Sequence, residues 1–139
     1  MKKIKLAYLI DDDDISNYLS EKILANVEFC DQLEVFSDAQ KALESLKHAI
    51  ASGQNIPEAI LFDLNMPEMD GWGFIKSFLE LPHKTKIPTF IFTSSINPTD
   101  RQRASDNKFI KDFITKPLTI HKIDKILRQI DASAVSNSE

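Results

Sequence analysis

Five short apolar runs alternate with amphipathic stretches along this chain, and the alternation limits the fold more than any other feature. Each run has the length of a buried strand, and the runs are Leu6–Ile10, Leu33–Phe36, Ala59–Phe62, Thr89–Phe92 and Phe109–Ile114. Parallel strands need long crossover connections, which helices usually supply. The sequence therefore predicts an α/β fold, a doubly wound five-stranded parallel sheet with helices on both faces.

The stretches between the runs predict the helices. The first has an apolar stripe of Ile15, Tyr18, Leu19, Ile23 and Val27. A third helix is expected from Gly71 to Pro82, and a fourth after the pair Asn97-Pro98. Residues 1–131 are expected to form one domain, and the small, polar residues 132–139 a disordered tail.

Composition excludes several classes of function. The net charge of −4 over 139 residues is opposite to the footprint of a nucleic-acid-binding protein, so direct binding to nucleic acid is not expected. The single cysteine, Cys30, allows no internal disulfide and fits a reducing compartment. The apolar run Leu6–Ile10 stops at four aspartates, and no stretch approaches the roughly 20 apolar residues that span a bilayer. We expect a soluble, cytoplasmic protein with no membrane contact.

Polar side chains follow the predicted strands at one edge of the sheet. Asp11 and Asp12 follow the first strand, Asp63 the third, Thr93 the fourth, and Lys116 lies just after the fifth. Ligands of open parallel sheets bind at this edge. Crowded carboxylates must either raise a pKa or bind a cation, and we favour the cation. Oxygen ligands suit Mg²⁺ best, with Mn²⁺ next.

The four consecutive aspartates divide into two roles. Aspartate is a preferred helix N-cap, so Asp13 and Asp14 are interpreted as helix-starting residues. Asp11 and Asp12 lie nearer the strand end and are interpreted as metal-binding. No glycine-rich turn follows the first strand, which excludes a dinucleotide or P-loop site.

Four motifs in order make the chain resemble the response-regulator receiver family, in a stand-alone form like the chemotaxis regulators. They are Leu9–Asp12, Phe62–Gly71, Phe92–Ser94 and Thr115–Leu118, and the likeness covers residues 4–131. The resemblance implies a flavodoxin-like strand order 2-1-3-4-5. It also implies that Asp63 is the phosphoacceptor, Asp12 a direct metal ligand and Asp11 a ligand through water, while Asn65 lends its backbone carbonyl to the metal.

The same resemblance implies a signalling switch rather than an enzyme. Thr93 would bind a phosphoryl oxygen, Lys116 would pair with the acceptor carboxylate, and Phe113 would respond to Thr93 as the switch residue. The phosphoryl donor would be a histidine kinase or a histidine phosphotransfer protein. The output would pass to an unknown downstream protein, and a homodimer is an open expectation.

Two alternatives stay open. A magnesium-dependent aspartyl-phosphate phosphatase also uses an aspartate nucleophile, but it needs a second acid two residues later, where this chain has Asn65. A degenerate receiver that acts as a phosphate-independent interaction module usually lacks an acid, the threonine or the lysine. Asp63, Thr93 and Lys116 are all present, so the phosphorylated switch is the preferred hypothesis.

Overall fold

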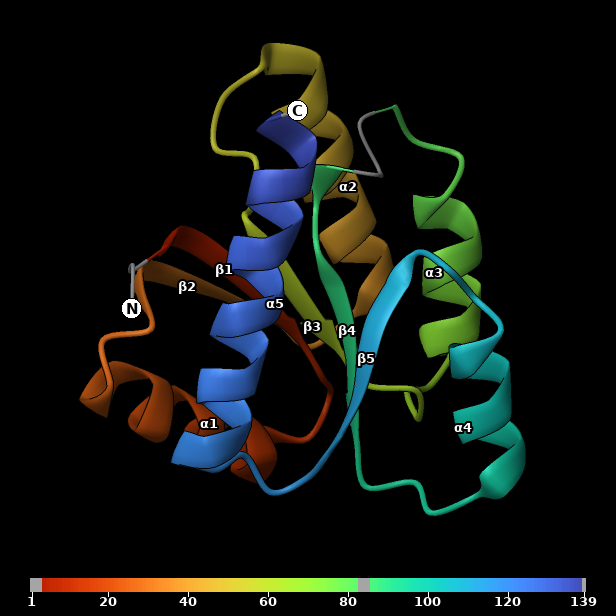
Figure 1. Cartoon of the computed structure of the whole chain (residues 1–139). Coiled ribbons are helices and arrows are strands. Elements are labelled where there is room, and N and C mark those ends of the chain that lie inside the picture. Colours follow the sequence, from red (N-terminus) through yellow and green to blue (C-terminus); the bar gives the residue numbers. More distant parts are fainter. Residues whose placement is uncertain (1–3, 83–85, 139) are drawn as a thin grey trace.

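The computed structural model describes residues 4–82 and 86–138 and is built on one parallel sheet. The strands are β1 (Ile4–Ile10), β2 (Cys30–Phe36), β3 (Ala59–Phe62), β4 (Thr89–Thr93) and β5 (Ile110–Thr115). They lie in the order β2-β1-β3-β4-β5, and each neighbouring pair runs parallel (Figure 1). The predicted α/β class and strand order are confirmed.

Five helices connect and cover the strands. They are α1 (Asp14–Asn26), α2 (Ala39–Ser52), α3 (Gly71–Phe78), α4 (Pro98–Ser105) and α5 (Ile120–Ser138). A side-chain oxygen accepts hydrogen bonds from backbone N–H groups of the first turn at the start of four helices, and the capping residues are Asp13, Asp38, Asp70 and Asn97. Such caps satisfy N–H groups that a helix leaves unpaired, so the short polar residues set where each helix begins.

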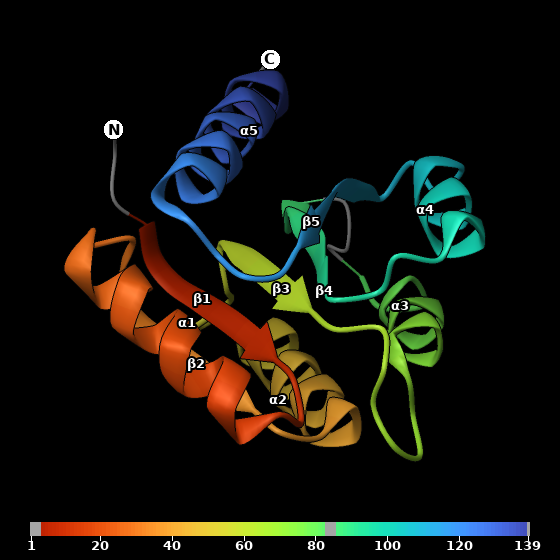
Figure 2. The same ribbon diagram turned by 90° about the horizontal axis from the view of Figure 1, so that it is seen from below.

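The sheet divides the core into two layers, because side chains alternate between its faces. On β1, Tyr8 and Ile10 pack with α2, α3 and α4, whereas Ala7 and Leu9 pack with α1 and α5. Figures 1 and 2 show the helices on the two sides of the sheet. All four strand residues are at most 1% exposed, which explains why the central strands have apolar runs without polar alternation.

Helix α1 turns only part of the predicted stripe inward, since Ile23 and Val27 pack against the core and the other three residues do not. Ile15, Tyr18 and Leu19 are 73%, 58% and 59% exposed, while Asn17 and Ser20 are buried. The apolar residues of α1 cover too much of its circumference for the 3.6-residue period to decide which face turns inward. A hydrogen bond from Asn17, described below, fixes the rotation of this helix.

Two helix ends also differ from the prediction. Helix α3 ends at Phe78, before the expected end at Pro82, and a tighter turn follows in which Leu81 N donates to Phe78 O. Helix α5 continues to Ser138, so the backbone of residues 132–138 is helical where a disordered tail was predicted. A helix that has already formed extends at little cost, because each added residue gains a hydrogen bond without a new nucleus. No helix within the described residues is long and apolar enough to cross a membrane.

Candidate functional site at the carboxyl edge of the sheet

Two acidic side chains come together because β1 and β3 are neighbours. Ile10 pairs with Phe62 at the end of the two strands, and Asp11 and Asp63 are the next residues. The backbone N–H of Asp63 donates to the carbonyl of Ile10 at 2.9 Å, so the two strand ends are fixed relative to each other. Asp11 is 0% exposed and Asp63 5% exposed. The structure thus brings two of the three predicted acids into one buried position.

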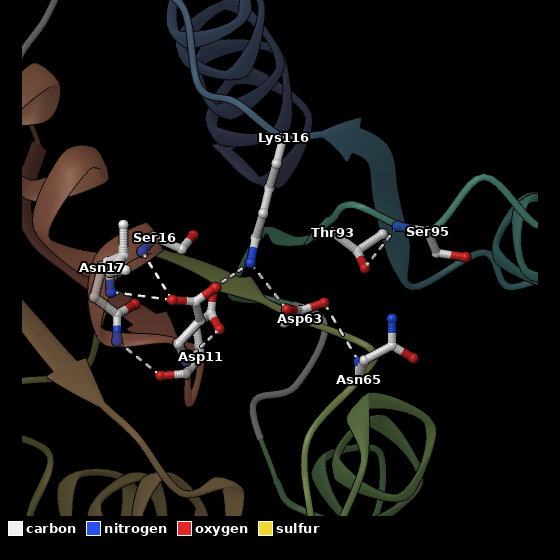
Figure 3. A network of polar contacts seen from close by, with 10 residues as sticks. Asp11, Ser16, Asn17, Asp63, Asn65, Thr93, Ser95 and Lys116 are labelled. Carbon is white, nitrogen blue, oxygen red and sulfur yellow. Dashed lines mark hydrogen bonds and ion pairs between the residues drawn. The ribbon is translucent and has the colours of Figure 1, made fainter.

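The side chain of Lys116 bridges these two carboxylates. Its Nζ lies 2.5 Å from Asp11 Oδ2 and 3.0 Å from Asp63 Oδ2 (Figure 3). The backbone N–H of Lys116 donates to Thr93 O at 2.9 Å, and the Lys116–Pro117 peptide bond is cis. Lys116, which the sequence analysis placed just after the fifth strand, therefore forms ion pairs with both buried carboxylates.

A second lysine holds the loop that carries Lys116. Lys122 Nζ donates to the carbonyl oxygens of Thr115 at 2.7 Å and Pro117 at 3.0 Å. These carbonyls flank Lys116 on either side, so the ammonium group of Lys122 ties the loop to the first turns of α5. The sequence analysis missed this residue, because a lysine in an amphipathic helix gives no sign of binding a loop.

Burial and charge act in opposite directions on the ionisable groups. Burial raises the pKa of the Asp11 carboxyl above its usual value, and the bond and charge of Lys116 offset only part of the rise. Burial acts to lower the pKa of Lys116, but its hydrogen bonds to Asp11 and Asp63 outweigh this, and the net pKa is raised. Lys116 is therefore firmly protonated at neutral pH, whereas the ionised form of Asp11 is disfavoured by its surroundings.

The start of α1 positions Asp11. The Nδ2 group of Asn17 donates to the backbone carbonyl of Asp11 at 2.8 Å, and Asp11 Oδ1 accepts from the N–H of Asp13 at 3.0 Å. Asp13 in turn caps the helix, as the sequence predicted, by accepting from the N–H groups of Ile15 and Ser16. Asn17 was not predicted. The sequence feature that could have revealed its role is that Asn17 and Ser20 are polar residues on the same face of α1, a face that is buried.

The loop after β3 is packed closely around the phosphoacceptor candidate. Asn65 N donates to Asp63 Oδ1 at 3.3 Å, and Gly71 N donates to Leu64 O at 2.9 Å. A Cβ atom at Gly71 would lie 2.5 Å from the backbone oxygen of Asp63 and 2.7 Å from Leu64 Cα. Because both are backbone atoms and cannot turn away, the start of α3 rests directly on the chain that carries Asp63.

The threonine and phenylalanine of the predicted switch lie on adjacent strands. β4 and β5 pair with Ile91 opposite Phe113 and Thr93 opposite Thr115. Thr93 is fully buried, and its Oγ1 accepts a hydrogen bond from Ser95 N at 3.3 Å (Figure 3). Phe113 is half-buried, and the guanidinium of Arg101 lies 4.7 Å from its ring centroid.

The carboxylates at this edge are the type of ligand that a hard divalent cation binds. Asp11 and Asp63 offer buried carboxylates, and Asp12 adds a third at the adjacent position, although its side chain is exposed. Within residues 4–82 and 86–138, no three His, Cys, Asp or Glu side chains are arranged to hold a metal ion. The Lys116 ammonium interacts with both buried acids, so the cation and Lys116 would share them.

Comparisons with known proteins agree with this geometry. Residues 7–128 match the family model described as response regulator receiver domain. The crystal structure of a two-component response regulator from Cytophaga hutchinsonii is similar, with a TM-score of 0.86 and 29% identity over 93% of this chain and 98% of that chain.

Two curated proteins are similar in sequence. The probable methanogenesis regulatory protein FilR2 of Methanothrix harundinacea is 24% identical over 88% of this chain and 78% of its own length. The sensor histidine kinase CheAY of Helicobacter pylori is 30% identical over 66% of this chain, but the match covers 11% of CheAY. The family model spans most of the chain. The chain belongs to the response regulator receiver domain family.

Proposed function

We propose that Asp63 accepts a phosphoryl group from a phosphohistidine on a partner protein, and that the phosphorylated domain signals by a change of conformation. The observation that carries the proposal is the position of Asp63, a buried carboxylate whose Oδ2 lies 3.0 Å from the Lys116 ammonium. Receiver domains interact with histidine kinases or phosphotransfer proteins. Because this chain belongs to the receiver family, a phosphohistidine of a partner protein is the phosphoryl donor that we favour.

In this reaction an oxygen of Asp63 attacks phosphorus and the phosphorus–nitrogen bond of phosphohistidine breaks. The electron pair of that bond stays on nitrogen, and the imidazole leaves as a neutral ring when its other nitrogen already carries a proton. The protein has little covalent chemistry to perform, so rate depends on position and on charge stabilisation. Lys116 neutralises negative charge on the phosphoryl oxygens, and its loop is held by Lys122. Hydrolysis of the aspartyl phosphate by water then resets the domain.

Receiver domains generally bind Mg²⁺ or Mn²⁺. Asp11, Asp12 and Asp63 would hold this ion here, together with the backbone carbonyl of Asn65. When bound, the cation supplies positive charge for the oxygens of the transferring group. The buried oxygen donors support this assignment, and the exposed side chain of Asp12 is free to turn toward the ion.

A groove beside Lys116 is the place where we expect the donor to dock. It has a volume of about 560 Å³, and its walls include Ile15 and Leu19 of α1 and Pro117 and Leu118 of the loop before α5. Ile15 and Leu19 are largely exposed, so a partner helix with an apolar face would cover them. The groove reaches Lys116 itself, which connects docking with the reacting carboxylate.

Thr93 and Phe113 are proposed to carry the response. A phosphoryl group on Asp63 adds strong acceptor oxygens, and the Thr93 hydroxyl would turn to donate to one of them. Phe113, on the neighbouring strand, would then repack and change the surface between α4 and α5. Output through an unidentified downstream protein and a cytoplasmic location stay predictions from the sequence, and a homodimer stays an open expectation.

The test uses acetyl phosphate as a small phosphodonor, with intact-mass measurement of the wild-type chain and of Asp63→Asn. We expect the wild type to gain one phosphoryl group in Mg²⁺ and to lose that gain in EDTA. Asp63→Asn keeps the shape but has no nucleophilic carboxylate, so it should gain nothing. Asp106→Asn, at an exposed site on the end of α4, is the control and should behave as wild type.

Two outcomes would contradict the proposal. Equal labelling of Asp63→Asn would move the phosphoacceptor to another residue. An unlabelled wild type that still binds its partner would favour the phosphate-independent interaction module.

A further inference from the structure

One carboxylate outside the phosphorylation site joins two segments that flank it. Asp100, in the first turn of α4, accepts a hydrogen bond from Ser95 Oγ at 2.7 Å and another from Trp72 Nε1 at 3.3 Å. Ser95 belongs to the loop after β4, and Trp72 belongs to the first turn of α3. We call these three residues the Asp100 bridge.

The loop end of the bridge leads directly to the switch threonine. Ser95 N donates to Thr93 Oγ1 at 3.3 Å, and Ser95 Oγ also accepts from Asn97 N at 3.3 Å (Figure 3 shows the contact with Thr93). Ser95 therefore has its backbone bonded to Thr93 and its hydroxyl bonded to Asp100. Ser95 thereby couples the position of the Thr93 side chain to the position of the loop after β4.

The other end of the bridge rests on the segment that carries the phosphoacceptor. Trp72 follows Gly71, whose Cα lies against the backbone of Asp63 and Leu64. The Trp72 ring packs on the core. The guanidinium of Arg103, a residue of α4, lies 4.3 Å from the centroid of the Trp72 ring. This end is fixed by packing, so the Ser95 end is the one that can move.

We propose that Asp100 is a positioning residue that holds the loop carrying Thr93 in its unphosphorylated position and thereby opposes the switch. This inference rests on the proposed phosphorylation of Asp63. When the Thr93 hydroxyl turns toward a phosphoryl oxygen, Ser95 N loses its acceptor. The loop can follow Thr93 only if Ser95 Oγ also leaves Asp100, and a bond to a carboxylate is stronger than a bond between neutral groups.

The proposal predicts that loss of the bridge makes the activated state easier to reach. Beryllofluoride, used with Mg²⁺, mimics the phosphoryl group on Asp63 without a covalent reaction. Ser95→Ala and Asp100→Ala should each bind it about tenfold more tightly than the wild type, a change of about 1.4 kcal/mol. Ser95→Thr keeps the hydroxyl and should restore the wild-type affinity.

A matched control separates the bridge from a simple loosening of α4. Asp100 also lies near the helix N-terminus, where a carboxylate stabilises the helix without any bridge. Asn97→Ala removes the N-cap bond to Thr99 N, at 2.9 Å, and leaves the contacts of Asp100 with Ser95 and Trp72 in place. It should therefore weaken α4 but leave beryllofluoride affinity at the wild-type value.

The indole N–H of Trp72 gives a second readout, because the chain has one tryptophan and hence one indole resonance in a ¹⁵N NMR spectrum. In the wild type this resonance should shift when beryllofluoride binds, as Asp100 loses Ser95. In Ser95→Ala the indole resonance should already differ from its wild-type position before beryllofluoride is added, and it should shift less when beryllofluoride binds. These changes would not follow from a general loss of stability.

The outcomes separate this inference from the proposed function. If the wild type binds beryllofluoride and both bridge variants bind with the wild-type affinity, the Asp100 bridge has no regulatory role. That result leaves the assignment of Asp63 as the phosphoacceptor unaffected. Equal tightening in Asn97→Ala would likewise overturn the bridge. If the wild type neither binds beryllofluoride nor accepts phosphate, both the function and the bridge are wrong.

Discussion

The two halves of the site are held by different kinds of interaction. At the ends of β1 and β3, Asp11 and Asp63 are buried and share the charge of Lys116. At the ends of β4 and β5, Thr93 contacts Ser95 N through one bond of 3.3 Å, and half-buried Phe113 lies under an exposed arginine. The first half is held by ion pairs between buried groups. The second half is held by a neutral hydrogen bond and an exposed cation–π contact, which are weaker and can be replaced by other contacts.

This difference is physically suited to a switch. Separating buried opposite charges leaves an uncompensated charge and is strongly unfavourable, so the half that holds Asp11, Asp63 and Lys116 has one stable arrangement. A neutral hydrogen bond contributes about 0.5–1.5 kcal/mol, and an exposed cation–π contact about 0.5–1 kcal/mol. The other half can therefore change its arrangement in response to a single new group.

The largest effect is expected from Lys116→Met, which leaves two buried carboxylates without their cation. We expect the free energy of unfolding in EDTA to fall by about 3 kcal/mol at neutral pH. Labelling by acetyl phosphate in Mg²⁺ should slow by about a hundredfold, as when one charge-stabilising donor is lost from an active site. Urea denaturation and intact-mass time courses measure the two quantities.

Lys125→Met is the control for this change. Lys125 pairs with Asp112 at 3.1 Å, but its side chain is 58% exposed, and such pairs contribute at most about 1 kcal/mol. If the two variants lost similar stability, Lys116 would not hold the charged half together, and the comparison between the halves would fail.

A smaller effect, with a defined pH dependence, is expected from Asp11→Asn. The folded-state pKa of Asp11 is raised, so the folded chain binds this proton more readily than the unfolded chain does. Stability from this group therefore falls as pH rises from the unfolded pKa through the folded one. The asparagine has no such titration, and the variant should be more stable than the wild type at neutral pH.

Urea denaturation from acidic to neutral pH, in EDTA, measures this effect. The advantage of Asp11→Asn should shrink as pH falls, because the wild-type carboxyl then becomes neutral too. A variant that is less stable than the wild type at neutral pH would mean that the ion pair with Lys116 outweighs the burial of Asp11.

The smallest effect is expected from Arg101→Met on the switch half. This change removes the cation above Phe113, and the free energy of unfolding should fall by no more than about 1 kcal/mol. Arg128→Met, which breaks an exposed pair with Asp124, is the control. The ring resonances of Phe113 should change in the first variant and not in the second. A loss of several kcal/mol would show that Phe113 is held as firmly as the charged half.

The sequence predicted the strands best where both faces are buried. The predicted bounds of β3 agree with the structure, because Ala59–Phe62 is apolar at every position. At the edge of the sheet, β2 starts at Cys30, three residues before the predicted start, because Asp31 and Gln32 are exposed and give no apolar signal. An apolar pattern indicates which residues are buried. It therefore cannot predict where an edge strand begins if its first residues are exposed.

Within the site, the sequence predicted the residue types but not all of their contacts. Asp63 and Lys116 were identified from their places after strands, which parallel topology brings to one edge. The inward position of Asn17 and the bridge from Ser95 to Asp100 depend on helix rotation and loop shape. These are tertiary properties, and the apolar pattern of α1 does not decide which of its faces turns inward.

The Lys116 bridge also has a consequence for folding. It joins groups that are 105 and 53 positions apart in the sequence, so almost the whole chain must be ordered before the bridge can exist. Contacts of long sequence separation form late and slowly, because chain entropy opposes them until the intervening strands have paired. A chain in which these strands have not yet paired would lack the Lys116 bridge. If Asp63 is the phosphoacceptor, as we propose, its phosphorylation therefore requires that the fold around it is nearly complete.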